Sequence, residues 1–179
     1  MSNIVSKNIR VRCPDDFIIG DNSIVDDFSY FSTKVKIGRC SHVASGCSIA
    51  GGKDSQFELG DYSSISSGVK IWCVSNDFSN DVVTIIPPEV LKISGNIKGS
   101  LIKGDVKIGN FTAVGSNTVI MPDNYIPEGT VVGAISFVPS GYKFKSWSVY
   151  AGIPVRFVKK RNRRNVLRQV ELIEKYLKK

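Results

Sequence analysis

The chain has 179 residues, of which 42% are hydrophobic, and its mean hydropathy is −0.01. This length suits one domain with a substantial core, and the composition excludes wholesale disorder. No apolar run approaches the ~20 residues that span a bilayer, and the N-terminal segment lacks the apolar stretch of a signal peptide. We therefore expect a cytoplasmic protein without a membrane span.

The net charge of +8 is concentrated at one end of the chain. Residues 1–155 contain 14 Lys+Arg and 14 Asp+Glu, whereas residues 156–179 contain 10 Lys+Arg and 2 Asp+Glu, a surplus of 8. Such a tail indicates either an anionic partner or a solvated basic helix, and charge alone leaves both open. The four cysteines form no CxxC pair and His42 is the only histidine, so we expect reduced, mostly buried thiols and no metal.

A repeat of six residues runs through most of the chain. Its apolar positions fall in three blocks: Ile19, Val25, Phe31, Ile37, Val43 and Ile49; Leu59, Ile65 and Ile71; and Ile102, Ile108, Val114, Ile120, Ile126, Val132 and Val138. Glycine often follows the apolar residue, and a small residue stands four positions after it, as in Ser23, Ser75 and Thr118. The period fits neither an α-helix nor an ordinary strand.

This period predicts a coil of short parallel strands in which three hexads make one triangular turn. The apolar residue would point inward, the small residue would fit the narrow interior, and glycine would permit the bend at each corner. Successive coils would hydrogen-bond about 4.8 Å apart. We expect the residues before Ile18 to cap the first coil, because the end of such a coil is an open sheet edge.

Two interruptions and a tail complete the predicted organisation. A small insertion lies at residues 51–56, and an excursion at about residues 77–101, which contains Pro87-Pro88, would project as a loop. The repeat ends near Ser140, and apolar spacing predicts a helix from about Arg161 to Leu177 that packs on the coil or on a neighbouring subunit. We expect a coil domain over residues 1–158 and a basic C-terminal helix within residues 159–179.

Over roughly residues 18–158 this pattern resembles the hexapeptide-repeat family. The resemblance implies an all-β fold, a left-handed parallel β-helix with a protruding loop and a C-terminal α-helix. It also implies a homotrimer whose active sites lie between subunits. Members include acyltransferases, oligomerisation stalks and gamma-class carbonic anhydrases, and the last are excluded because their zinc needs three histidines.

The C-terminal third carries the most specific resemblance. The segments VGSNTVI (114–120), VGAIS (132–136) and AGIPVRFVK (151–159) are similar to the coenzyme A end of galactoside-type sugar acetyltransferases. The resemblance implies that acetyl-CoA is bound at the positions of Ser116, Ala134, Pro139, Ser140, Arg156 and Lys159. Pro139 and Ser140 replace the Thr-Lys pair of those members. Ser116 and Ala134 occupy equivalent places in hexads three apart, so we expect them to stack, with the basic tail meeting the cofactor's phosphates.

The middle third resembles a bacterial acyltransferase subfamily found with polysaccharide-building enzymes. GRCSHVA (38–44) and SSGVKIWCVSNDFS (66–79) carry this likeness, and Asn76 replaces the first Asp of the family's Ser-Asp-Asp motif. Acyl transfer to a hydroxyl needs a base, for which His42 is the candidate, with Asp77 to hold its ring and Asn76 to orient a substrate. Counting coils separates His42 from Asp77 within one chain. The homotrimer that the resemblance implies would allow them to meet across subunits, which we take as a hypothesis.

These patterns predict an acetyl-CoA-dependent sugar acetyltransferase. Its acceptor would be a hydroxyl or an amine of a sugar or nucleotide-linked sugar, in O-antigen or capsule (lipopolysaccharide) biosynthesis, with Trp72 or Phe78 stacking on the sugar. If the acceptor is an amine, no strong base is required and His42 would only position it. The alternative is a non-catalytic trimeric scaffold that binds an anionic partner through its tail. We expect no nucleic acid partner, because the tail lacks interleaved aromatic residues.

Overall fold

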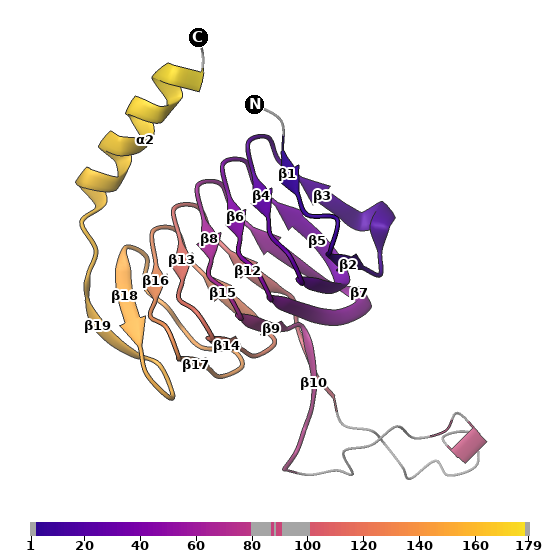
Figure 1. Cartoon of the computed structure of the whole chain (residues 1–179). Helices are drawn as coiled ribbons and strands as arrows, with labels where there is room; N and C mark the ends of the chain where they lie inside the picture. The colour runs from indigo at the N-terminus through magenta and orange to yellow at the C-terminus, as the bar shows by residue number, and fades with distance from the viewer. Residues whose placement is uncertain (1–2, 80–86, 88, 91–100, 178–179) are drawn as a thin grey trace.

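The computed structural model describes residues 3–79, 87, 89–90 and 101–177, and it shows a stack of triangular coils that carries an arm and a C-terminal helix (Figure 1). Three faces, here called A, B and C, run along the stack, and each coil contributes one short strand to each face. Apart from the last strand of face A, the strands of each face are parallel. The predicted parallel β-helix with three hexads per turn is thus confirmed.

The strands of the three faces follow one another in chain order. Face A consists of β1 (Ile4–Val5), β4 (Ile24–Val25), β6 (His42–Val43), β8 (Ser64–Ile65), β13 (Ala113–Val114), β16 (Val131–Val132), β18 (Ser148–Ala151) and the antiparallel β19 (Arg156–Lys160). Face B consists of β2 (Arg10–Val11), the first part of β5 (Tyr30–Ile37), the first part of β7 (Ser48–Leu59), β9 (Lys70–Trp72), β14 (Val119–Ile120) and β17 (Phe137–Val138). Face C consists of β3 (Phe17–Ile19), which follows the short 3-10 helix η1 (Pro14–Asp16), the second parts of β5 and β7, β12 (Val106–Ile108) and β15 (Asn124–Ile126).

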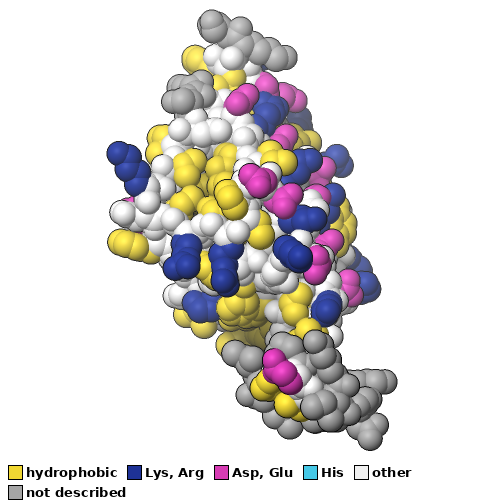
Figure 2. Space-filling view, turned by 90° about the vertical axis from the view of Figure 1, so that its right-hand side faces the viewer, with side chains coloured by type: hydrophobic (Ala, Val, Ile, Leu, Met, Phe, Trp, Pro, Cys, Tyr) yellow, Lys and Arg dark blue, Asp and Glu magenta, His cyan; other side chains and the backbone are white. Residues whose placement is uncertain are grey.

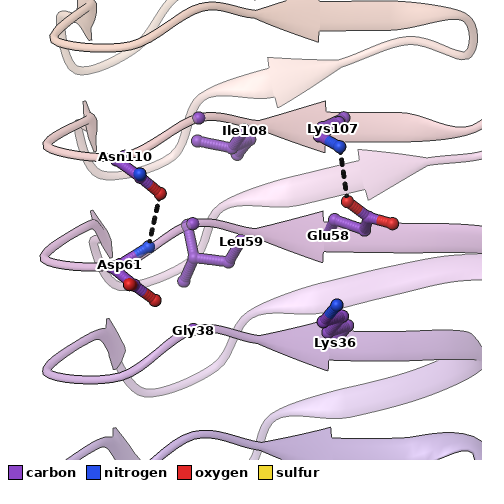
Figure 3. A pocket seen from close by; sticks show the side chains of 10 residues that line it. Lys36, Gly38, Glu58, Leu59, Asp61, Lys107, Ile108 and Asn110 are labelled. Atoms are coloured by element: carbon purple, nitrogen blue, oxygen red, sulfur yellow. Dashed lines mark hydrogen bonds and ion pairs between the residues drawn. The ribbon is translucent and has the colours of Figure 1, made fainter.

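The apolar positions of the repeat form the core. From Val25 to Ile71 and from Ile108 to Val138 every one of them is at most 2% exposed. On face C, Leu59 and Ile108 point into the coil, whereas Lys36, Glu58 and Lys107 line up on the outside, where the Lys107 ammonium lies 2.9 Å from the Glu58 carboxylate (Figure 3). Over the side seen in Figure 2, basic and acidic side chains are interspersed, in keeping with the equal charge counts of residues 1–155.

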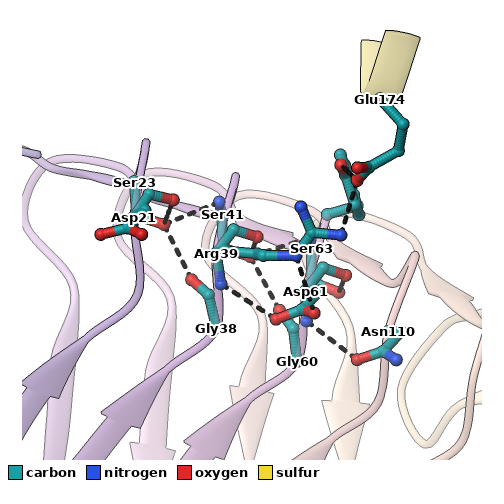
Figure 4. Close-up of polar contacts among 11 residues, drawn as sticks. Asp21, Ser23, Gly38, Arg39, Ser41, Gly60, Asp61, Ser63, Asn110 and Glu174 are labelled. Carbon is teal, nitrogen blue, oxygen red and sulfur yellow. Dashed lines mark hydrogen bonds and ion pairs between the residues drawn. The ribbon is translucent and has the colours of Figure 1, made fainter. Parts of the chain in front are cut away.

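The small residues of the repeat form a buried ladder of hydroxyl groups (Figure 4). The Ser23 hydroxyl donates to the Gly38 carbonyl at 2.8 Å and accepts from the Ser41 backbone N–H at 3.0 Å. Ser41 repeats this one coil further, donating to the Gly60 carbonyl at 2.7 Å and accepting from the Ser63 N–H at 3.2 Å. Each hydroxyl therefore satisfies backbone groups of the next coil, which explains the preference for Ser and Thr over Ala.

The glycines of the repeat serve a different purpose from the one predicted. A Cβ on Gly60 would lie 2.6 Å from the Asn110 backbone nitrogen, and one on Gly115 would lie 2.3 Å from that of Ala134. Neither has a positive φ. The left-handed corner conformation falls instead on other residues, such as Cys40 and Phe111. Glycine is thus needed because the next coil passes too close for a side chain, not because the corner bends there.

The coil begins and is interrupted differently from the prediction. β1 and β2 pair in parallel with β4 and β5, so the residues before Ile18 form a first coil rather than only a cap. β10 (Val74–Asn76) and β11 (Leu101–Lys103) pair antiparallel as an arm that leaves the stack at the corner between faces B and C. Ile102 and Ser75, predicted as repeat positions, pair with each other in this arm and are not in a coil. Most of the predicted excursion lies outside the described residues.

The predicted helix is present as α2 (Arg163–Leu177), and it runs back along the corner between faces C and A. The Glu174 carboxylate accepts hydrogen bonds from the Arg39 guanidinium and the Tyr62 hydroxyl. At the other end of the helix, the Arg163 guanidinium lies 5.4 Å from the Trp147 ring centroid. No residue of α2 is buried, so these polar and cation–π contacts, rather than a buried face, hold the helix on the coil.

Candidate active site

His42 forms a pair with a carboxylate of the preceding coil. Its Nε2 lies 2.8 Å from Asp26 Oδ2, and both side chains are 44% exposed. The register of β4 and β6 places Ile24 beside His42, and Asp26 follows two residues after Ile24. A carboxylate on one ring nitrogen fixes the tautomer and the orientation of the imidazole. Within one chain, the carboxylate that contacts the His42 ring is therefore that of Asp26, a residue that the sequence analysis did not single out.

Asn76 and Asp77 lie at the end of β10, on the arm rather than on the coil. Asp77 Oδ1 accepts a hydrogen bond from the Ser79 backbone N–H at 2.9 Å, which is the geometry of an Asx turn. Both side chains are half-buried. The arm leaves the stack at the corner between faces B and C, whereas His42 lies on face A. A meeting of His42 and Asp77 across subunits remains a prediction.

Ser116 and Ala134 stack at the corner between faces A and B, as their spacing predicted. The Ile135 backbone N–H donates to the Ser116 carbonyl at 2.9 Å, and β13 and β16 are in register. The equivalent positions of the two preceding coils are also small. Together they form a strip, here called the small-residue strip, that consists of Ala44, Ser45, Ser66, Ser67, Gly115, Ser116, Gly133 and Ala134. The strip begins beside His42 and leads along the axis to the C-terminal end of the coil.

The other predicted coenzyme A positions divide into two groups. Arg156 and Lys159 are exposed on β19, where Arg156 is opposite Ala151 and Lys159 is opposite Val149 at the end of face A. Pro139 and Ser140 follow β17 at the corner between faces B and C. The structure therefore brings Arg156 close to the small-residue strip and puts Pro139 and Ser140 across the width of face B.

The two predicted aromatic residues are in different surroundings. Trp72 is half-buried on β9, and the registers of β9, β14 and β17 put it in one column with Met121 and Pro139. Phe78 is 70% exposed on the arm. Trp72 and Pro139, to which we assigned different roles, thus belong to a single half-buried column that runs along the edge of face B.

Three residues beside these positions escaped the sequence reasoning. Asp26 orients His42, the Ser67 hydroxyl lies 3.3 Å from that of Ser45, and the Lys70 ammonium donates to the Gly68 carbonyl at 3.3 Å. Asp26 could have been found from the period alone, since His42 is 18 residues after Ile24 and 18 residues are one full coil. Nothing in the repeat marks Ser67 or Lys70 as special.

The cysteines and the hollow on face C lie apart from these residues. Burial raises the pKa of the Cys47 and Cys73 thiols to about 11, and Cys13 and Cys40 are half-buried. All four are free thiols, and two of them are buried. The hollow is lined by Lys36, Lys107 and Asn110 (Figure 3). No helix within the described ranges is long and apolar enough to cross a membrane.

The chain is similar to several acyltransferases. It is 28% identical over 84% of its length to dTDP-4-amino-4,6-dideoxy-D-glucose acyltransferase of Escherichia coli, of which it covers 74%. Among solved structures, it matches AntD, an N-acyltransferase from Bacillus cereus in complex with dTDP-4-amino-4,6-dideoxyglucose and coenzyme A. The TM-score is 0.83 with 31% identity, over 97% of this chain and 88% of AntD.

Other matches are looser. A maltose O-acetyltransferase from Clostridium difficile 630 matches with a TM-score of 0.61 and 21% identity, over 81% of this chain and 70% of that one. At that identity the match shows the shared fold alone. No family model matches the chain.

Proposed function

Since this chain belongs to the hexapeptide-repeat, left-handed β-helix sugar acyltransferases, which take their acyl group from a coenzyme A thioester, we propose that it acylates the amino group of a dTDP-linked amino sugar. The observation that carries this proposal is the similarity over 97% of the chain to an N-acyltransferase bound to such a sugar and to coenzyme A. The relative from Escherichia coli is named for the same sugar. The comparisons give no support to the alternative of a non-catalytic scaffold.

Coenzyme A would lie along the small-residue strip. Small side chains at Ser116 and Ala134 leave room for the extended pantetheine chain, and Arg156 and Lys159 supply positive charge for its phosphates at the C-terminal end. Three coil spacings separate the level of His42 from that of Ala134, about 14 Å at 4.8 Å per coil. The thioester would then face His42. Pro139 and Ser140 would contact the cofactor from across face B.

The reaction would need little proton transfer by the protein. The lone pair of the acceptor nitrogen forms the new C–N bond at the thioester carbonyl carbon, and the C–S bond breaks. The proton lost by the nitrogen passes to the departing thiolate, so that coenzyme A leaves as the thiol. The His42–Asp26 pair would hold the acceptor amine in line with the carbonyl rather than act as an obligatory base.

Asn76 and Asp77 would complete the site from a second subunit. We place them across a homotrimer interface because the arm that carries them points away from face A of its own chain. Structures of AntD include variants of one serine and of an aspartate ten residues further along. Ser67 and Asp77 have this spacing, as do Ser66 and Asn76. This spacing favours a role for Ser67 at the strip and for Asp77 on the arm, with Phe78 and Trp72 beside the sugar.

The biological setting we propose is the assembly of O-antigen or capsular polysaccharide in the cytoplasm, where activated amino sugars are modified before polymerisation. The acyl group is proposed to be acetyl. A longer acyl-CoA is the competing donor, since AntD has been solved with 3-hydroxybutyryl-CoA. Comparing acetyl-CoA with 3-hydroxybutyryl-CoA at equal acceptor concentration decides between them.

The experiment that tests the function is the release of free thiol from acetyl-CoA. The acceptors are dTDP-4-amino-4,6-dideoxyglucose, other nucleotide amino sugars, and free sugars such as maltose. We expect turnover with a nucleotide amino sugar and none with maltose. Saturable binding of coenzyme A without turnover on any acceptor would contradict the proposed acceptor class. The absence of both binding and turnover would contradict the assignment as an enzyme.

A further inference from the structure

Face B carries a line of outward-pointing side chains that neither the sequence analysis nor the proposed site uses. Successive strand registers place them one coil apart in the order Arg10, Tyr30, Ser48, Lys70, Val119 and Phe137. The line therefore changes from basic and polar at the N-terminal end to apolar at the C-terminal end. Among the described residues it contains no carboxylate, in contrast to the line on face C, where Glu58 lies between Lys36 and Lys107.

A second arginine strengthens the basic end of this line. The Arg12 guanidinium donates to the Tyr30 hydroxyl at 3.3 Å, and the Arg12 backbone N–H donates to the Phe31 carbonyl at 2.9 Å. Hydrogen bonds from Ser32 and from Arg12 lower the pKa of Tyr30, and the charges of Arg12 and Arg10 act in the same direction. Both arginines are exposed, so two guanidinium groups with free donors face the solvent around one phenol.

The position of this cluster matches what a two-substrate transfer requires. The reacting groups of donor and acceptor must meet near His42, and each substrate then extends away from that point. The C-terminal direction is taken by the proposed coenzyme A, whose phosphates face Arg156 and Lys159. A nucleotide-linked acceptor is also anionic at its non-reacting end, and the N-terminal direction is the one left to it. Arg10 lies two coils before the coil of His42 and Ser48, about 10 Å along the axis.

We infer that Arg10 and Arg12, with Tyr30 between them, bind the diphosphate of the acceptor nucleotide. This inference rests on the proposed function, because it assumes that the acceptor is a nucleoside diphosphate sugar. Guanidinium groups suit this role because their planar donors fit phosphate oxygens and stay charged at every physiological pH. Lys70, three coils beyond Arg10 on the same line, adds a third positive charge to face B.

The test compares Arg10→Gln, Arg12→Gln and the double variant with Lys36→Gln, which removes one exposed positive charge from face C. Binding of dTDP and of thymidine is measured by calorimetry, and the KM for acetyl-CoA and for the amino sugar by thiol release. For the double variant we expect dTDP binding and the KM for the acceptor to worsen by about tenfold to a hundredfold. The KM for acetyl-CoA should change less than about twofold, and Lys36→Gln should resemble the wild type.

The outcomes separate this inference from the proposed function. Normal turnover with an unchanged acceptor KM in the double variant overturns the inference and leaves the function standing. Binding of dTDP that depends on the two arginines, without turnover on any amino sugar, supports the inference and overturns the proposed reaction. Equal binding of thymidine and dTDP by the wild type overturns the inference, since the phosphates would then contribute nothing. Tyr30→Phe, which removes only the hydroxyl, should weaken dTDP binding less than Arg12→Gln does.

Discussion

His42 Nε2 and Asp26 Oδ2 lie 2.8 Å apart on adjacent coils, and this pair joins two residues that are 16 positions apart in the sequence. With 44% of each side chain exposed, such a pair contributes little to folding stability. Its consequence is orientation, because the Asp26 carboxylate holds one nitrogen of the His42 ring in place beside the start of the small-residue strip. In the proposed reaction, this pair is the fixed point around which the two substrates are placed.

Replacing His42 distinguishes a positioning residue from a base. With an amino sugar as acceptor, we expect His42→Ala to lower kcat/KM by about tenfold, well below the ~10²–10⁴-fold that loss of general base catalysis costs. Asp26→Asn should cause a similar or smaller loss, measured by the same thiol-release assay. A loss of more than about a thousandfold in His42→Ala with an amine acceptor would contradict the positioning role.

The proposed sharing of the site between subunits predicts complementation. Purified His42→Ala and Asp77→Asn variants should each have reduced activity. Because a mixed trimer contains interfaces where intact His42 meets intact Asp77, unfolding and refolding the two variants together should recover activity beyond the sum of the two. Refolding each variant alone is the control. If mixtures that are shown by mass to contain mixed trimers recover no activity, the proposed sharing is wrong. His42 and Asp77 would then either act within the site of one subunit or not share a site at all.

The close approach of adjacent coils predicts that substitution at one glycine lowers the stability of the protein, whereas substitution at another has little effect. Gly60→Ala should destabilise the protein by about 1–3 kcal/mol, the usual cost of overpacking, since its Cβ would lie 2.6 Å from the Asn110 nitrogen. Gly46→Asn should change the stability by less than about 1 kcal/mol, because Gly46 has a φ of +68° with open space around it and Asn tolerates that conformation. Denaturant unfolding of both variants checks the pair. Equal losses would contradict the steric explanation.

The buried thiols predict a pattern of alkylation. The thiolate is the reactive form, and burial raises the pKa of Cys47 and Cys73 to about 11. In the native protein near pH 8 we expect iodoacetamide to modify Cys13 and Cys40 faster than Cys47 and Cys73, and the latter two to react faster as the pH rises toward 11. Peptide mass spectrometry after timed labelling measures this. Rapid modification of Cys47 at pH 8 would show that the coil opens there.

The period of six was sufficient to predict most of the fold. Positions such as Phe31 and Val114 are buried because the period measures the length of one side of the triangle, which is a property of the backbone. The prediction failed at Ser75 and Ile102. These residues match the small and apolar types of the repeat, but they pair with each other in the arm and belong to no coil. It also failed for the role of glycine, because a periodic glycine looks the same whether it turns the chain or admits a neighbouring coil.

The candidate site was predictable only where it follows the repeat. Ser116 and Ala134 stack because equivalent hexad positions lie in one column, and the same rule would have paired His42 with Asp26. The arm follows no period, so the positions of Asn76, Asp77 and Phe78 relative to the coil could not be calculated from spacing. Arg12 was also missed, since its contact with Tyr30 depends on a first coil that the prediction treated as a cap.

The nature of the acceptor atom is the point on which the proposed reaction depends most. We would compare dTDP-4-amino-4,6-dideoxyglucose with the dTDP sugar that has a hydroxyl in place of the amine, with acetyl-CoA as the donor and mass spectrometry of the product as the readout. We expect an amide to form with the amino sugar and no acylated product with the hydroxyl sugar. An ester formed on the hydroxyl sugar at a comparable rate would contradict amine-specific acyl transfer.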